Sequence, residues 1–179
     1  MNKKGESELN LMKNLTTVER TSERELAVTR TFSGPAEIVF EAWSKPELLK
    51  QWWVPKSIGI SFVSCEADVR TGGTYRFVFS HPASEQTMAF FGRYIEVTPH
   101  SRIAWTNEES PDGPISTVTF EEKGDKTLLI LRELYPSKQA LDDALASGST
   151  GTSGAAEQFE QLDILLATLV KSAPEGSSH

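Results

Sequence analysis

Cysteine and histidine are scarce in this 179-residue sequence, which contains one cysteine, Cys65, and three histidines. One thiol cannot form a disulfide within the chain, and without a second cysteine there is no thiolate pair to bind a metal. His81 and His100 stand in turn segments and His179 ends the sequence, so none is placed like a catalytic base or matches a zinc spacing. No phosphate-binding Gly-Lys-Ser loop occurs either. We therefore expect no metal, no cofactor and an inert Cys65 in a reducing compartment.

Long hydrophobic runs and an excess of basic residues are also absent. No stretch approaches the roughly 18 apolar residues that cross a bilayer, and no run of signal-peptide length stands near the first residue. Lys and Arg number 18 against 25 Asp and Glu, which gives a net charge of -7 and disfavours a nucleic-acid surface. We expect a cytoplasmic protein that has neither a membrane nor a nucleic acid as its partner.

The chain has the composition of one globular domain, with 38% hydrophobic and 24% charged residues. Residues 24–171 are expected to form this domain. Residues 1–23 are mostly polar and weakly patterned, which predicts a flexible arm, and Met12 within it is a second candidate start. Residues 172–179 are predicted to be a disordered tail.

Short strand-like runs separated by turn residues fill the middle of the chain. Arg24–Phe32 alternates in polarity and predicts the first strand. Lys123-Gly124-Asp125 predicts a hairpin between the last two runs. The later strands are expected near residues 58–65, 66–70, 74–80, 88–97, 102–107, 115–121 and 127–135.

Helical patterns follow the first strand and close the chain. Two short helices are predicted, one over residues 35–43 and one that opens at Pro46 and stops before Pro55. Residues 137–146 predict a further helix. Ser147–Gly154 contains only Ser, Gly and Thr, which predicts a flexible loop that is either a passive connector or a lid hinge.

The last helix shows an apolar stripe with helical spacing and is predicted to extend to about Lys171. We expect an α+β fold, in which a curved antiparallel sheet of about seven strands wraps around this long C-terminal helix. Such a sheet can leave an apolar space for a small ligand. The stripe consists of Ala155, Phe159, Leu162, Leu166 and Leu169.

Aromatic residues are the first candidates to line that space. Tyr75, Phe77 and Phe79 alternate along one strand, so their rings share one sheet face and either pack in the core or line a cavity. Trp52 and Trp53 are adjacent in a predicted helix and project about 100° apart, so one should pack inward and one should lie near an edge. An exposed indole there would suit a contact between two copies of the chain.

Charged residues within strands are the second group of candidates. Arg132 and Glu133 are neighbours in a strand and must point to opposite faces, so one of them is aimed inward. A buried charge needs a partner or a polar ligand group. Arg93 poses the same question. The full set of candidate cavity residues is Trp52, Trp53, Tyr75, Phe77, Phe79, Arg93, Trp105, Phe120, Arg132, Glu133 and Phe159, and no catalytic residue is assigned.

Short motifs distributed over residues 25–170 carry a family resemblance. They are Phe40-Glu41-Ala42-Trp43, Pro46-Glu47, Gln51-Trp52-Trp53-Val54-Pro55, Asp68-Val69-Arg70-Thr71-Gly72-Gly73, Gly92-Arg93-Tyr94, Arg102-Ile103-Ala104-Trp105-Thr106 and Thr117-Val118-Thr119-Phe120. With them the chain resembles the START-like or SRPBCC superfamily, and within it the branch named for activators of heat shock protein 90 ATPase. The resemblance implies the helix-grip fold. The segment Ala155–Phe159 departs from the Gly-Trp pair that many relatives carry at the start of the last helix.

The resemblance implies three functions, because members of the superfamily share a fold and not a catalytic set. The favoured one is binding of a small apolar or aromatic molecule as a carrier, sensor or sequestering protein. The second is a co-chaperone that stimulates the chaperone ATPase, which is disfavoured because such activators resemble this domain plus a separate amino-terminal domain. The third is a cyclase-like or hydrolase-like enzyme that uses an inward Arg or Glu.

Overall fold

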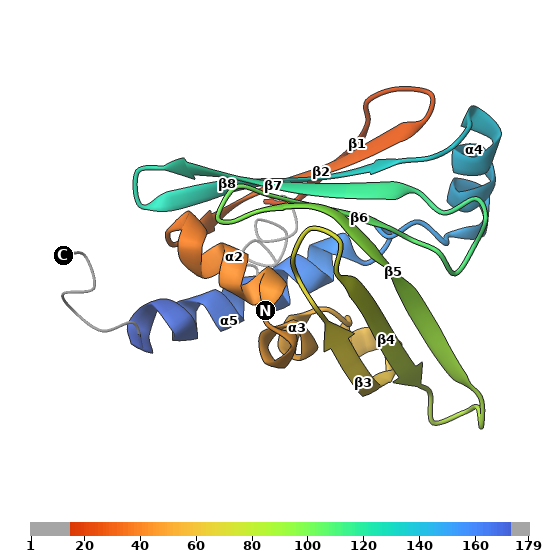
Figure 1. Cartoon of the computed structure of the whole chain (residues 1–179), viewed down its shortest axis with the longest axis horizontal. Helices are drawn as coiled ribbons and strands as arrows, with labels where there is room; N and C mark the ends of the chain where they lie inside the picture. The colour runs from red at the N-terminus through yellow and green to blue at the C-terminus, as the bar shows by residue number, and fades with distance from the viewer. Residues whose placement is uncertain (1–14, 173–179) are drawn as a thin grey trace, which may run out of the picture.

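The computed structural model describes residues 15–172, which form one curved antiparallel sheet with helices on its concave side (Figure 1). Within this part of the chain, eight strands pair in the order β1-β2-β8-β7-β6-β5-β4-β3. The strands are β1 (Thr17–Arg20), β2 (Glu25–Ser33), β3 (Ser61–Ala67), β4 (Thr74–Ser80), β5 (Thr87–Thr98), β6 (Arg102–Thr106), β7 (Ile115–Lys123) and β8 (Lys126–Leu134).

The long C-terminal helix runs along the inside of the sheet, as Figure 1 shows. It contacts β2 together with the two short helices that follow that strand. This arrangement confirms the predicted helix-grip fold. No helix among the described residues is both long enough and apolar enough to cross a membrane. The helices are α2 (Ala36–Ser44), α3 (Pro46–Trp52), a 3-10 turn (Lys56–Ile58), α4 (Lys138–Ser147) and α5 (Ala155–Ser172).

The register of the central strands decides which side chains point inward. Glu133 on β8 pairs with Ser116 on β7, and Ser116 pairs with Trp105 on β6. Trp105 in turn pairs with Tyr94 on β5. Because paired residues in an antiparallel sheet share one face, these four side chains form a row across the concave surface.

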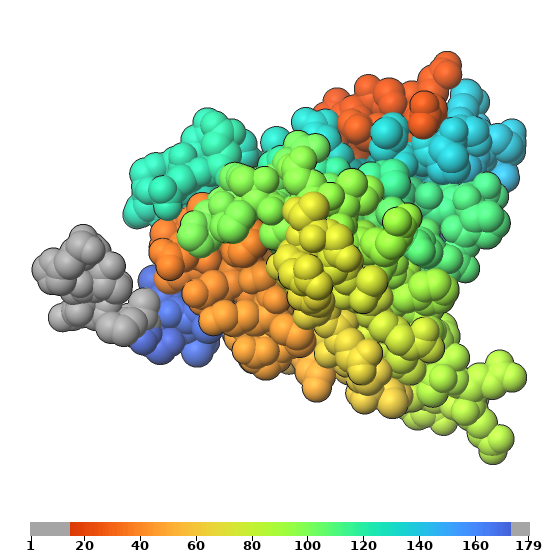
Figure 2. All heavy atoms as spheres, in the orientation of Figure 1, coloured from red at the N-terminus to blue at the C-terminus, as the bar shows by residue number. Residues whose placement is uncertain are grey.

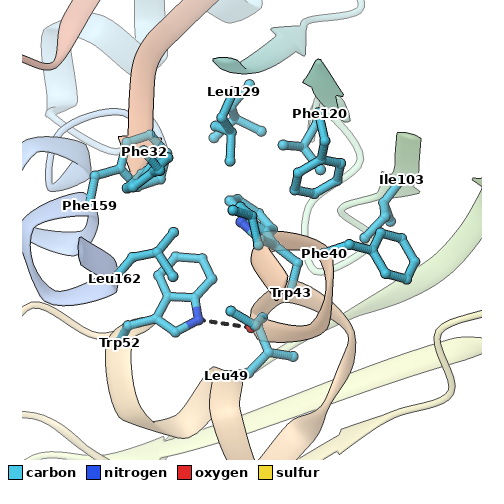
Figure 3. Packing of buried hydrophobic residues seen from close by; sticks show 14 of the residues in the cluster. Phe32, Phe40, Trp43, Leu49, Trp52, Ile103, Phe120, Leu129, Phe159 and Leu162 are labelled. Carbon is cyan, nitrogen blue, oxygen red and sulfur yellow. Dashed lines mark hydrogen bonds between the residues drawn. The ribbon is translucent and has the colours of Figure 1, made fainter. Parts of the chain in front are cut away.

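A cluster of aromatic rings joins α2 and α3 to the sheet and to α5. The Trp43 ring lies 4.7 Å from that of Trp52 and 6.1 Å from that of Phe120 between ring centroids, and Figure 3 shows it between these two residues. The indole nitrogen of Trp52 donates a 2.9 Å hydrogen bond to the backbone oxygen of Ala42. That bond gives the buried indole N–H a hydrogen-bond acceptor, and it fixes α3 against α2.

Two predictions about the strands were wrong. The runs expected at 58–65 and 66–70 form a single strand, β3, which begins at Ser61 and ends at Ala67. A tight turn follows, in which a side chain at Gly73 would place its Cβ 1.9 Å from the backbone oxygen of Asp68. The chain must therefore turn immediately after β3, and no room is left for a separate strand.

The segment predicted as a flexible arm contains an ordered strand. β1 pairs with β2 through backbone hydrogen bonds, which need no apolar pattern in the sequence, and its four side chains are exposed. Arg20 also forms a 2.8 Å ion pair with Asp142 on α4, and Figure 2 shows β1 beside that helix. Residues 1–14 of the predicted arm and 173–179 of the predicted tail lie outside the described residues.

Candidate functional site

A cavity of about 360 Å³ lies between the concave face of the sheet, the segment that follows α3 and the first turn of α5. Most of its wall is apolar, and many of the lining side chains are aromatic. The aromatic lining residues are Trp43, Trp52, Trp53, Tyr75, Phe77, Phe79, Phe90, Tyr94, Trp105, Tyr135 and Phe159.

Eight of the candidate residues from the sequence line this cavity, namely Trp52, Trp53, Tyr75, Phe77, Phe79, Trp105, Glu133 and Phe159. The two adjacent tryptophans differ as expected, because Trp52 is only 1% exposed whereas Trp53 is partly exposed. Trp52 therefore cannot supply the exposed indole that a contact between two copies would use. The hydroxyl of Tyr75 donates a 2.6 Å hydrogen bond to the backbone oxygen of Thr106, which holds its ring in the wall.

The other three candidates lie outside the cavity wall. Phe120 packs in the core, 5.8 Å from Phe40 between ring centroids. Arg93 is exposed and forms a 2.8 Å ion pair with Glu108, because its neighbour Tyr94 takes the inward position on β5. Arg132 points outward by the same alternation and pairs with Glu25 at 3.1 Å, so an enzyme that uses an inward Arg132 is excluded.

Glu133 is the charged residue that β8 turns inward. It is 5% exposed, and its Oε1 atom has no hydrogen-bond partner within the described part of the chain. Burial raises the pKa of this carboxyl to about 7, whereas the backbone amide of Gly151 and the hydroxyl of Tyr135 act in the opposite direction. At neutral pH the side chain therefore lies close to the midpoint of its titration.

The loop between α4 and α5 closes the cavity beside Glu133. A Cβ atom added at Gly151 would lie 2.8 Å from Oε1 of Glu133, so the glycine lets the loop backbone reach the carboxyl. Thr150 and Thr152 are buried, and their hydroxyl oxygens lie 2.8 Å apart. The Ser-Gly-Thr segment that the sequence predicts as a flexible loop thus forms part of the wall.

Polar residues form the smaller part of the cavity wall, and some of them are bonded to one another. Asn107 donates hydrogen bonds from Nδ2 to Ser116 Oγ at 3.0 Å and to the Pro114 oxygen at 2.7 Å. The indole nitrogen of Trp43, like Oε1 of Glu133, has no partner among residues 15–172. These are two buried polar atoms of cavity-lining residues that the described part of the chain leaves without a hydrogen bond.

Several lining residues were not among the candidates from the sequence. Tyr94 and Tyr135 could have been found by alternation, since Tyr135 has the same parity as Glu133 in the last strand. Asn107 and Glu109 lie in the segment between β6 and β7, where no periodicity indicates the direction of a side chain.

Neither a metal-binding cluster nor the thiol of Cys65 forms part of the cavity wall in residues 15–172. No group of His, Cys, Asp and Glu among the described residues could hold a metal ion. Cys65 lies outside the cavity wall, and burial raises the pKa of its thiol to about 11, despite the opposing charge of Lys50. The thiol is therefore protonated and a poor nucleophile at neutral pH.

Comparison with known proteins places this geometry in a family. Residues 33–167 match the family model described as activator of Hsp90 ATPase homolog 1-like protein. No curated protein matches the chain significantly.

Solved bacterial structures share the fold over nearly their whole length. A protein from Rhodobacter sphaeroides is 25% identical with a TM-score of 0.75, and the match covers 86% of this chain and 99% of that one. A protein from Staphylococcus epidermidis is 25% identical with a TM-score of 0.70, covering 91% and 99%. A protein from Nitrosomonas europaea is 23% identical with a TM-score of 0.72, covering 84% and 99%, which is a likeness of fold alone.

Proposed function

Because the chain belongs to the family of activator of Hsp90 ATPase homolog 1-like proteins, we propose a function that a single domain of this fold can perform. The protein binds a small hydrophobic or aromatic molecule inside the cavity between the sheet and α5. Binding of this kind serves to carry, sense or sequester the molecule, and no chemical reaction is assigned to it.

The observation that carries the proposal is the cavity of about 360 Å³ with its aromatic wall. The cavity is open on one side, so a ligand has a route into it and would remove its apolar wall from water. Pockets that bind small molecules are typically apolar with a few polar groups, which matches the wall described above. Aromatic rings supply a large contact area for a flat or apolar ligand.

A neutral fluorescent probe tests the proposal directly. N-phenylnaphthylamine becomes fluorescent in apolar surroundings, and we expect it to bind the protein saturably with one molecule per chain. The variant Ile60→Trp adds bulk to a residue that lines the cavity and should weaken binding by about tenfold. The variant Val63→Trp is the matched control, because Val63 is 58% exposed on the nearby β3 and is not part of the cavity wall.

Two results would contradict the proposal. One is an absence of saturable probe binding to the unmodified protein. The other is equal binding by the Ile60→Trp and Val63→Trp variants, which would place the probe on the outer surface of the molecule.

The family description supports one second candidate, the stimulation of an Hsp90 ATPase. The assay is ATP hydrolysis by purified Hsp90 with and without this protein. Under the ligand-binding proposal the rate stays unchanged. A saturable rise in the rate, retained in the Ile60→Trp variant, would favour the co-chaperone function instead.

A further inference from the structure

Glu133 is a buried acidic group that forms no ion pair with a basic side chain in residues 15–172. It lines the cavity at 5% exposure, and its Oε1 atom is unpartnered within residues 15–172. A buried carboxylate is costly unless a cation or several hydrogen bonds stabilise it. Its strand neighbour Arg132 cannot help, because that side chain lies on the opposite face and pairs with Glu25.

The rest of the cavity wall has the same sign of charge. None of the described residues that line the cavity is Lys, Arg or His, whereas both Glu133 and Glu109 line it. A cleft lined by one sign of charge concentrates ions of the opposite sign. The wall therefore favours a cation and disfavours a carboxylate or a phosphate.

The aromatic rings reinforce this preference. A ring face attracts a cation that lies within about 6 Å of the ring centre, and tryptophan does so most strongly. Trp43, Trp53 and Trp105 line the cavity, as do Tyr94 and Tyr135. A site that combines several such rings with a buried carboxylate suits an ammonium group attached to an apolar body.

From these observations we propose that the ligand is an apolar molecule that carries a basic amine. Its ammonium group lies beside Glu133 under the α4–α5 loop, and its hydrocarbon or aromatic body fills the space between the rings. This inference rests on the proposed function and specifies the chemical class of the ligand. Apolar acids and neutral apolar molecules of the same shape are the disfavoured classes.

Binding of an amine is expected to depend on pH in a characteristic way. The pKa of Glu133 is raised by burial to about 7, and an adjacent ammonium group would lower it, so binding is accompanied by loss of a proton from the carboxyl. The amine should therefore bind more tightly as the pH rises from about 6 to 8, while its nitrogen is still protonated.

The other titratable groups on the cavity wall are Glu109 and the phenols Tyr75, Tyr94 and Tyr135. The phenols stay neutral in this range because burial raises the pKa of each of them.

Three indole compounds of similar shape test the inference by calorimetry. Tryptamine carries an ammonium group, tryptophol a hydroxyl group and indoleacetic acid a carboxylate. We expect tryptamine to bind about tenfold more tightly than tryptophol at about pH 8, and indoleacetic acid to bind most weakly. At about pH 6.5, where most of the Glu133 carboxyl is still protonated, titrations in two buffers of different ionisation enthalpy should show proton release with tryptamine and none with tryptophol. This measurement uses the unmodified protein and does not depend on whether a variant folds.

Matched variants assign the preference to one carboxyl group. Glu133→Gln keeps the shape of the side chain and removes its charge, so the preference for tryptamine over tryptophol should fall below about threefold. Glu121→Gln is the control, because Glu121 is an exposed carboxylate on the neighbouring strand β7 that pairs with Lys123. It should leave the preference unchanged. Circular dichroism of both variants confirms that they are folded.

The outcomes separate this inference from the proposed function. Binding of N-phenylnaphthylamine without any preference for tryptamine would overturn the amine inference and leave the proposed function in place. Tighter binding of indoleacetic acid, or a preference for tryptamine that survives in Glu133→Gln, would also overturn the amine inference. Failure of the neutral probe to bind would contradict the proposed function itself.

Discussion

The two ends of the protein interior are built differently. Under β2, β7 and β8 the space is filled, and Figure 3 shows Phe32, Phe120 and Leu162 among the side chains that pack there. Toward β4, β5 and β6, and at the end of β8 that carries Glu133, the same sheet face borders the cavity. The filled end holds α5 to the sheet, and the hollow end is free to accommodate a ligand. Stability and binding should therefore respond to substitutions at different ends.

The largest expected effect is on stability, from a truncation at the filled end. Phe120→Ala removes a buried ring that packs on Phe40 and Trp43, and it should cost about 3–5 kcal/mol of the free energy of unfolding. Urea denaturation measures this cost. The comparison variant is Phe90→Ala, since Phe90 lines the cavity and is already 40% exposed. Similar losses for the two variants would show that the two ends do not differ in packing.

The second effect concerns the pH dependence of stability. Burial raises the pKa of Glu133 from 4.5 to about 7, so its neutral form favours the folded state. The stabilisation is complete below pH 4.5 and is lost as the pH rises through about 7. A shift of this size corresponds to about 3 kcal/mol. As the pH rises from 4.5 to about 7, the free energy of unfolding of Glu133→Gln should therefore increase by about that much relative to the unmodified protein. Urea midpoints at both ends of this range provide the measurement.

The control for this prediction is Glu121→Gln, which alters an exposed carboxylate. Its stability should follow that of the unmodified protein across the whole pH range. If the Glu133→Gln curve also ran parallel to that of the unmodified protein, Glu133 would have an ordinary pKa and could not be buried as described.

A smaller effect is expected from the loop that closes the hollow end. In Gly151→Ala the new methyl group would lie 2.8 Å from Glu133 Oε1, so the carboxyl or the loop must move. We expect the affinity for tryptamine to fall by about tenfold. The free energy of unfolding should fall by about 1 kcal/mol, because the added methyl group is overpacked. Ser147→Ala is the matched control, because Ser147 begins the same Ser-Gly-Thr segment, is exposed and is not part of the cavity wall. An unchanged affinity in Gly151→Ala would separate the loop from the binding site.

The smallest effects should come from the two arginines that the sequence could not orient. Arg93→Gln and Arg132→Gln alter side chains that pair outside the cavity with Glu108 and Glu25. Their affinity for N-phenylnaphthylamine should stay within about twofold of the unmodified protein. A large loss in either variant would mean that the arginine reaches the cavity and that the described strand register is wrong.

Local patterns were sufficient to predict most of the fold. The alternation in β4 and the apolar stripe of α5 predict their inward faces, because each pattern repeats with the period of its own element. The strand β1 was missed, since its pairing relies on backbone groups and its side chains are exposed. The turn at Gly73 likewise decides where β3 ends. It brings the backbone of Gly73 close to the backbone oxygen of Asp68, and no local sequence pattern indicates this approach.

The candidate site was harder to predict because it depends on contacts between distant segments. Residues 128–131 of β8 are apolar on both faces, so alternation alone could not choose whether Arg132 or Glu133 points inward. The pairing of Glu133 with Ser116 on β7 and Leu26 on β2 makes that choice. The approach of Gly151 to the same carboxyl is a further long-range contact that no local pattern indicates.

The most direct test of the account is a crystal structure of the protein grown with N-phenylnaphthylamine. The account predicts electron density for the probe inside the sheet, in contact with Trp53, Tyr75 and Trp105 and enclosed by the α4–α5 loop. Probe density found only on the outer surface, or a cavity filled by the protein's own side chains, would contradict it.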